Sequence, residues 1–197
     1  MPRITDPIKK LAFASFKGEL SRAAFEEHME ELGWIELDFG AYASVYGNKS
    51  KPYILKKLNE PDMGYETYVR LIHRHPNKHF PIISDMKKLR FNKDNYYVYL
   101  IEKLYRIPYR KGNQILKDIL NTYEDLLYLE GRMQTVISTY LGKSVRNNGP
   151  SKFLRDNPSL IEAIYFLAHD SYDDLDFHDE NIMQRANGTI VITDPYA

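Results

Sequence analysis

The residues best suited to chemistry lie in an acidic stretch near the C-terminal end of the chain. Asn181 follows Asp176 by five positions, and Asp194 follows Asn181 by thirteen. Two apolar runs, 182–183 and 190–192, flank an Asn-Gly pair at 187–188. Because Asn and Gly both tolerate positive φ, this pattern predicts a tight β-hairpin. Such a hairpin brings Asn181 and Asp194 to adjacent strand ends, close enough to share a cation.

One amide oxygen and one carboxylate are a suitable protein contribution to a Mg²⁺ site, because Mg²⁺ takes its remaining oxygen ligands from phosphate and water. A second carboxylate, that of Asp176, could accept the proton of a phosphate acceptor or orient its hydroxyl. The pattern therefore favours phosphoryl transfer. The alternative is that the acidic run 170–180 only caps helices and faces water, since Asp-x-x-x-x-Asn is common by chance.

The segment 176–194 resembles the catalytic loop and metal-binding aspartate of protein kinases, D-x-x-x-x-N followed by D-F-G. The resemblance implies an α+β fold with two lobes: a five-stranded antiparallel N-lobe with one main helix, and a mostly helical C-lobe. It implies ATP and Mg²⁺ as cofactors. Asp176 would be the catalytic base or orienting group, and Asn181 and Asp194 the metal ligands.

The elements that position ATP in a kinase have counterparts earlier in the chain. Residues 34–39, 45–47 and 53–56 have the composition of strands, with a small-residue loop at 40–44 and a turn at 48–52. A loop of small residues allows close approach to phosphates, because little side chain intervenes. The alternative is a plain hairpin without a ligand.

Residues 37–46 are similar to the kinase glycine-rich loop, although Asp38 and Ala43 replace two of its glycines. The resemblance implies that Lys56, at the end of the third strand, neutralises phosphate oxygens. We prefer Lys56 to Lys57, whose side chain should point to the opposite face of the strand. The loop and strand residues that would contact the nucleotide are Gly40, Ala41, Tyr42, Val45 and Lys56.

Between the third and fourth strands the sequence predicts a helix over residues 62–74. The resemblance implies that Glu66 on this helix pairs with Lys56, and the alternative is a solvated glutamate on a surface helix. Residues 80–83 and 96–101 are interpreted as two further strands, with a turn at 93–95. The backbones of Glu102 and Leu104 would then contact the adenine edge.

Three histidines, His73, His75 and His79, lie close together in sequence. Their spacing is not that of a helical metal-ligand pair and no carboxylate joins them, so we expect exposed loop residues rather than a metal site. From residue 105 onward, apolar residues recur at three-four spacing, which predicts helices, with a further helix at 158–169. Residues 147–150 read as a loop.

The predicted organisation has three parts: a helical brace at 1–33, a kinase-like N-lobe and hinge at 34–104, and a partial helical C-lobe at 105–197. The sequence given stops three residues after Asp194. By the resemblance, the C-lobe is therefore truncated after the metal-binding aspartate. The chain is then either part of a longer protein or a minimal or inactive kinase fold.

Composition excludes several functions. Lys plus Arg and Asp plus Glu each number 27, so net charge points neither to nucleic acid nor to an acidic membrane. The absence of cysteine excludes disulfides, thiol catalysis and cysteine-ligated zinc. No apolar run approaches the length of a membrane span. We expect a cytoplasmic protein with no membrane partner and no specific nucleic-acid partner.

Within the kinases, the chain most resembles the early serine/threonine kinases of T-seven-like bacteriophages, through Asp-x-His at 176–178 and Thr-Asp-Pro at 193–195. That resemblance implies a serine/threonine protein kinase that modifies host proteins in the host cytoplasm. The alternative is a binding module that inhibits a host or partner protein by contact, favoured by Asp38, Ala43 and the missing peptide-binding helices. A small-molecule phosphotransferase is a third reading, suggested by His178 where kinases have lysine.

Overall fold

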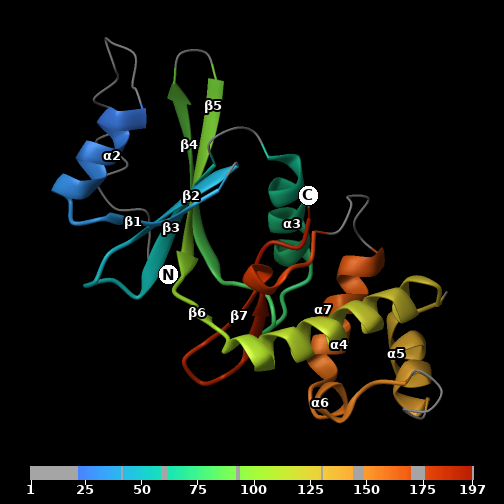
Figure 1. Ribbon diagram of the computed structural model, residues 1–197. Helices are drawn as coiled ribbons and strands as arrows, with labels where there is room; N and C mark the ends of the chain where they lie inside the picture. The colour runs from blue at the N-terminus through green and yellow to red at the C-terminus, as the bar shows by residue number, and fades with distance from the viewer. Residues whose placement is uncertain are drawn as a thin grey trace. The chain divides into compact units, whose positions relative to one another are not determined.

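The protein has an α+β fold, which confirms the α+β part of the predicted fold class (Figure 1). The computed structural model describes residues 22–40, 42–58, 62–91, 94–129, 131–143, 149–169 and 176–196. The part of the predicted brace before residue 22, and Ala41 of the small-residue loop, lie outside the described residues. The chain forms two compact units, Met1–Met63 with Ile82–Lys103 and Gly64–Pro81 with Leu104–Ala197.

The first unit contains an antiparallel sheet of five strands in the order β1-β2-β3-β5-β4, as the sequence predicted for number and direction. Helix α2 (Arg22–Glu31) precedes the sheet, and Gly33, with a φ of 76°, lies in the turn that follows it. The strands are β1 (Ile35–Phe39), β2 (Ala43–Gly47), β3 (Tyr53–Leu58), β4 (Ile83–Phe91) and β5 (Asp94–Glu102).

The hairpin of β4 and β5 differs from the prediction at both ends. Strand β4 begins at Ile83, after Pro81, which lacks an N–H for the sheet ladder. It continues to Phe91 through a polar run that gave no strand signal. As an edge strand, β4 accommodates lysines, which are common on such edges. Asp94 pairs with Phe91, so Asp94 belongs to β5 and the predicted turn over 93–95 is wrong there.

Helix α2 buries its apolar face against one side of this sheet. Lys57 is only 6% exposed on that side, and its Nζ lies 5.5 Å from the centre of the Phe25 ring. Lys56 follows the strand alternation and points to the other face, as expected. The core beneath α2 consists of Phe25, Met29, Trp34, Tyr46, Leu55, Val98 and Leu100.

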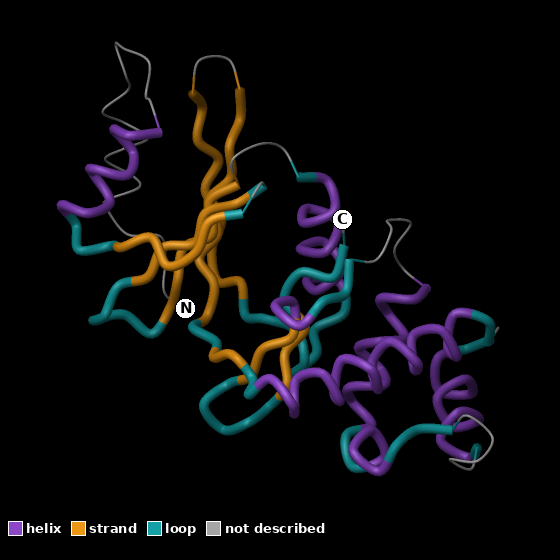
Figure 2. Tube along the Cα trace, viewed as in Figure 1, coloured by secondary structure: helices purple, strands orange, loops and turns teal. Residues whose placement is uncertain are grey.

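The second unit combines helices with a small antiparallel sheet, β6-β7-β8 (Figure 2). Its central helix is α7, which packs against both α4 and α5 and occupies the residues predicted for it. The helices are α3 (Met63–Arg74), α4 (Tyr109–Leu127), α5 (Met133–Gly142), α6 (Lys152–Arg155), α7 (Pro158–His169) and the short 3-10 helix η2 (Asp179–Asn181). The strands are β6 (Tyr105–Arg106), β7 (Ile182–Gln184) and β8 (Ile190–Ile192).

The predicted hairpin is present between β7 and β8. Its loop holds three residues, because the Arg185 N–H donates to the Thr189 carbonyl at 2.9 Å and closes the loop over 186–188. Gly188 has a φ of 82°, which only glycine adopts without strain, and its N–H donates to the Arg185 carbonyl. Gly188 is thus required by the turn that connects the two strands.

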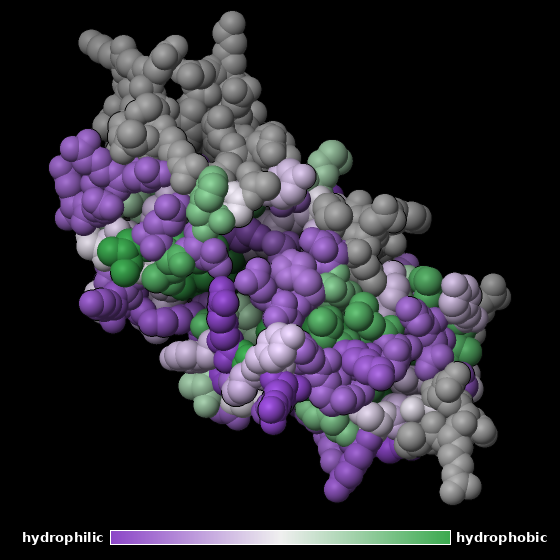
Figure 3. All heavy atoms as spheres, viewed as in Figure 1, coloured by the Kyte–Doolittle hydropathy of each residue, from purple (hydrophilic) through white to green (hydrophobic). Residues whose placement is uncertain are grey.

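Within the described residues, no helix is long and apolar enough to cross a membrane. On the face shown in Figure 3, hydrophobic residues form several small areas separated by hydrophilic ones. Isolated apolar side chains of this kind are normal on protein surfaces.

Alanine substitution at two glycines tests whether the backbone conformation of the turn affects the stability of the hairpin. A Cβ on Gly188 or on Gly142 would meet nothing within 4 Å, but only Gly188 has positive φ. We expect Gly188→Ala to lower the free energy of unfolding by about 1 kcal/mol, because alanine is strained at that φ. Gly142→Ala, at the end of α5, should raise it by roughly 0.5 kcal/mol. Urea unfolding of both variants checks this, and destabilisation of equal size in both would contradict it.

Candidate active site

Three chain segments that carry the predicted chemistry are joined by hydrogen bonds. The Asp176 N–H donates to the Pro195 carbonyl at 2.9 Å. The Asn181 side-chain Nδ2 donates to the Asp176 carbonyl at 2.8 Å, and the Thr193 N–H donates to the Asn181 carbonyl at 2.9 Å. The chain from 193 to 195, which contains Asp194, is therefore bonded both to Asn181 and to Asp176. These bonds connect the segments that contain the three residues, and the shared cation predicted for Asn181 and Asp194 stays a prediction.

The side chains in this group differ in exposure. Asn181 is buried, at 9% exposure, and its Nδ2 donates inside the protein, which leaves the amide oxygen as the side-chain atom that could bind a cation. Asp194 is half-buried and Asp176 is exposed. An exposed carboxylate can meet a substrate, and a carboxylate and an amide both offer the oxygen atoms that Mg²⁺ prefers. The three residues therefore offer one exposed carboxylate and two less exposed oxygen donors.

Two charged contacts involve side chains of the segment 176–180. The His178 Nε2 lies 3.8 Å from Asp176 Oδ2, an ion pair only when the imidazole is protonated. Arg106 of β6 lies 3.5 Å from Glu180, and both side chains are largely exposed. Exposed pairs of this kind contribute about 0–1 kcal/mol to stability, so the backbone bonds, rather than these pairs, hold the loop.

The outer edge of β8 is completed by side chains and by the segment between α3 and β4. The Ile192 N–H donates to the His79 carbonyl at 2.9 Å, and His79 Nδ1 lies 2.7 Å from the Ile190 carbonyl. The Tyr68 hydroxyl on α3 donates to the Ile192 carbonyl. The guanidinium of Arg185 donates to the Lys78 carbonyl and, at 3.0 Å, to that of Phe80. These bonds fix the strand that leads directly into Asp194.

His79 is neutral in this arrangement. A carbonyl only accepts, so Nδ1 carries the proton, and Nε2 accepts from the Ser159 hydroxyl of α7 at 3.1 Å. Burial lowers the pKa of His79, the bond to the Ile190 carbonyl opposes that shift, and the nearby cations Lys78 and Arg185 add to it. His79 therefore links β8 to α7 as an uncharged group.

The expectation of an exposed histidine loop is wrong for His79, which is 1% exposed. His73 is exposed, as expected, and its Nδ1 lies 2.7 Å from the Val69 carbonyl. His75 is half-buried and stacks on Phe166 of α7, with ring centres 4.0 Å apart. Sequence spacing could not reveal this, because the partners of His75 and His79 lie far along the chain. No local pattern identified Tyr68 either.

In the first unit, the register places two predicted nucleotide-binding residues side by side. Val45 on β2 is directly opposite Lys56 on β3, and Lys56 is opposite Tyr99 on β5. The Gly40 N–H donates to the Ala43 carbonyl at 2.8 Å, which closes the loop between β1 and β2. Tyr42 in that loop is 61% exposed. The loop is therefore tight, with its aromatic side chain in solvent.

The remaining predicted residues are Glu102, Leu104 and Glu66. The Glu102 N–H donates to the Ile82 carbonyl at 3.0 Å, and its carboxylate accepts from the Ile82 N–H at 2.8 Å. Leu104 follows in the other compact unit. Glu66 lies on α3, with Arg70 one turn later at 4.0 Å. Its predicted pairing with Lys56 stays a prediction.

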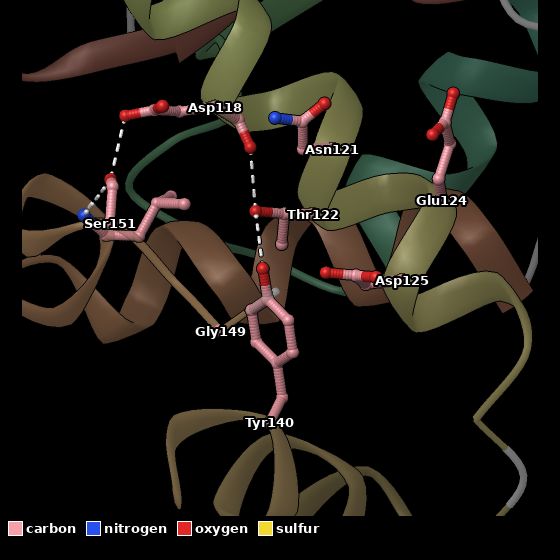
Figure 4. A pocket seen from close by; sticks show the side chains of 9 residues that line it. Asp118, Asn121, Thr122, Glu124, Asp125, Tyr140, Gly149 and Ser151 are labelled. Atoms are coloured by element: carbon pink, nitrogen blue, oxygen red, sulfur yellow. Dashed lines mark hydrogen bonds between the residues drawn. The ribbon is translucent and has the colours of Figure 1, made fainter. Parts of the chain in front are cut away.

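A separate cavity of about 360 Å³ lies between α4, α5 and the start of α6 (Figure 4). Asp118 there accepts from Ser151 at 2.7 Å and from Gln114 at 3.0 Å, and the hydroxyls of Thr122 and Tyr140 are 3.1 Å apart. Its acidic lining is thus already hydrogen-bonded in part, and we assign no ligand to it. The lining residues are Asp118, Asn121, Thr122, Glu124, Asp125, Tyr140, Gly149, Ser151 and Leu154.

No protein-family model matches this sequence, and no curated protein matches it. Among the described residues, no group of three or more His, Asp or Glu side chains is placed to hold a metal ion. The pair of Asn181 and Asp194 is a smaller group, with one amide and one carboxylate. The function is therefore argued from the hydrogen-bonded group of Asp176, Asn181 and Asp194 itself.

The buried imidazole of His79 gives a pH dependence with a definite sign. The pKa of His79 is lower in the folded protein than its ordinary value of 6.5. Between these two pKa values, the unfolded chain therefore binds more protons than the folded protein. The stability that neutral His79 contributes is complete above about pH 7. It is lost as the pH falls below 6.5. The difference in unfolding free energy between wild type and His79→Asn should therefore narrow from pH 8 to pH 5.

Urea unfolding at several pH values measures that difference. The exposed residue His73 supplies the control, since His73→Asn removes a histidine without breaking the bonds to β8. If the difference in unfolding free energy between wild type and His79→Asn stays constant with pH, the structural role given to neutral His79 is contradicted.

Proposed function

We propose that this chain is an ATP- and Mg²⁺-dependent serine/threonine protein kinase. The observation that carries the proposal is the set of hydrogen bonds that joins Asp176, Asn181 and the segment of Asp194. The spacing of these residues resembles that of kinases, and their side chains are a carboxylate in solvent, an oriented amide and a half-buried carboxylate. These are the groups that phosphoryl transfer requires.

In this proposal each residue has a different task. Asp194 and the amide oxygen of Asn181 would hold Mg²⁺, which would supply positive charge against the negative charge that develops during transfer. Asp194 matters more than Asn181, because a carboxylate brings negative charge to the cation. Asp176 orients the acceptor hydroxyl and accepts its proton. Its exposure allows a protein side chain to reach it.

Most residues assigned to the nucleotide belong to the first unit, whereas Leu104 and Glu66 belong to the second. Lys56 is assigned to the phosphates, with its cross-strand neighbour Val45 as an apolar contact for adenine. Since the Glu102 N–H already donates to Ile82, we assign the adenine contact to the Glu102 carbonyl and to the backbone of Leu104. The loop containing Gly40, Ala41 and Tyr42 is assigned to the phosphates, and Glu66 to pairing with Lys56.

The substrate assignment rests on the resemblance to the early kinases of T-seven-like phages. The matching elements are Asp-x-His at 176–178 and Thr-Asp-Pro at 193–195. They support host proteins as the phosphate acceptors, with serine and threonine hydroxyls as the reacting groups.

Transfer of labelled γ-phosphate from ATP to the protein itself, or to an added protein, tests the proposal. Asp176→Ala should lower transfer by about 10²- to 10⁴-fold, the usual contribution of a general base. Asp179→Ala is the matched control, since it removes an exposed carboxylate from the same loop. It should retain transfer.

Thermal shift separates binding from transfer. Bound Mg-ATP at a hundred times its Kd stabilises by roughly 2.7 kcal/mol. Asp176→Ala should keep most of this shift, whereas Asp194→Asn should lose most of it. Equal labelling of wild type and Asp176→Ala would overturn the kinase proposal. If both variants keep the effect of the wild-type protein on host cells, the alternative of a binding module that inhibits a host or partner protein by contact is favoured.

A further inference from the structure

Strand β8 has a neighbouring strand on one edge only, because it is the last strand of the β6-β7-β8 sheet. Backbone groups on the other edge need partners when they are buried. All three residues of β8 are buried, and the partners of its outer edge are Tyr68 and His79. The position of the strand therefore depends on residues more than a hundred positions earlier in the chain.

One peptide group receives a bond on each side. The carbonyl of Ile192 accepts from the Tyr68 hydroxyl, and the N–H of Thr193, which belongs to the same planar peptide, donates to the Asn181 carbonyl at 2.9 Å. Because the peptide is planar, bonds at both of its ends fix its orientation. Thr193 is followed directly by Asp194. The orientation of the peptide therefore directs the path of the backbone into the candidate metal ligand.

The Tyr68 hydroxyl is itself held in place. The ring is fully buried and packs edge-on against Phe80 and Tyr196, with ring centres 6.0 Å and 6.1 Å away. Burial raises the pKa of Tyr68 well above its ordinary value, and the nearby Tyr65, Asp194 and Tyr196 add to the shift. The phenol therefore stays protonated and acts as a donor.

We propose that Tyr68 is a positioning residue that sets the place of Asp194 for Mg²⁺ through the peptide between Ile192 and Thr193. The inference rests on the proposed function, since it assigns Asp194 to the metal. Tyr68 lies on α3, two residues after Glu66. Through the Tyr68 hydroxyl, α3 is hydrogen-bonded to the strand that leads to the metal ligand. Tyr68 touches neither nucleotide nor metal in this proposal and acts only through the backbone.

Two measurements on Tyr68→Phe test this. The first is amide hydrogen exchange without ligand, reported as the exchange rate of the Thr193 amide relative to amides in α7. Loss of one hydrogen bond from the shared peptide should raise that ratio by about three- to tenfold. General destabilisation would raise both rates together and leave the ratio unchanged.

The second measurement is the Mg²⁺ concentration that gives half of the thermal shift at saturating ATP. It should rise by about three- to tenfold in Tyr68→Phe, while the shift with ATP and a chelator stays as in wild type. Tyr140→Phe is the matched control, because it also removes a buried hydroxyl with a hydrogen-bond partner in the same compact unit (Figure 4). It should leave the Mg²⁺ requirement unchanged.

The outcomes are distinguishable. A wild-type protein that shows no Mg²⁺-dependent shift overturns the proposed function and the metal role of Asp194 with it. A wild type that responds to Mg²⁺, together with a Tyr68→Phe variant of unchanged Mg²⁺ requirement, overturns the positioning role alone. An unchanged Thr193 exchange ratio, or an equal response in Tyr140→Phe, overturns it as well.

Discussion

A short hairpin cannot satisfy its own outer edge, and this constraint shapes the candidate site. Strand β8 bonds to β7 on one side, while its other side faces the interior of the unit. An unpaired buried carbonyl or N–H costs about 1–3 kcal/mol, so the fold must bring partners to it. Tyr68 and His79 are those partners. The same bonds that satisfy the strand also determine where Asp194 lies.

This requirement gives a physical reason why residues 64–81 cluster with the C-terminal part of the chain. The segment lies along β8, with Arg185 bonded to the carbonyls of Lys78 and Phe80, and it is bonded to α7 through Ser159. The Asn77 side chain adds a second bond to the Ser159 carbonyl at 2.9 Å. Helix α3 thus shares a compact unit with the hairpin, while the strands before and after this segment form the five-stranded sheet.

The sequence was informative where the signal is local. The Asn-Gly pair and its flanking apolar runs predicted the hairpin, and apolar spacing predicted α7 over 158–169. The alternation of Lys56 and Lys57 was correct because strand side chains alternate. Asp176 and Asn181, five positions apart, are in contact through the Asn181 side chain, and Asn181 is the last residue of η2.

Signals that depend on distant partners were missed. His79 was expected in solvent, because nothing near it in sequence indicates that Ile190 and Ser159 cover it. The role of Tyr68 was missed for the same reason, since its hydrogen-bond partner Ile192 is 124 positions away. The strand predicted at 80–83 shares only Ile83 with β4, because an edge strand can be as polar as a loop and most of β4 gave no signal. Each miss reflects tertiary structure overriding a local pattern.

The central claim is that Asn181 and Asp194 bind one divalent cation together with ATP. Mn²⁺ accepts the same oxygen ligands as Mg²⁺ and broadens the NMR signals of nuclei near it. With Mn²⁺ and ATP, we expect the Asn181 side-chain amide and the Asp194 backbone amide to broaden first, and α5 to stay sharp. Broadening that is strongest around Asp118 and Asp125 of the separate cavity, or that ignores ATP, would contradict the account.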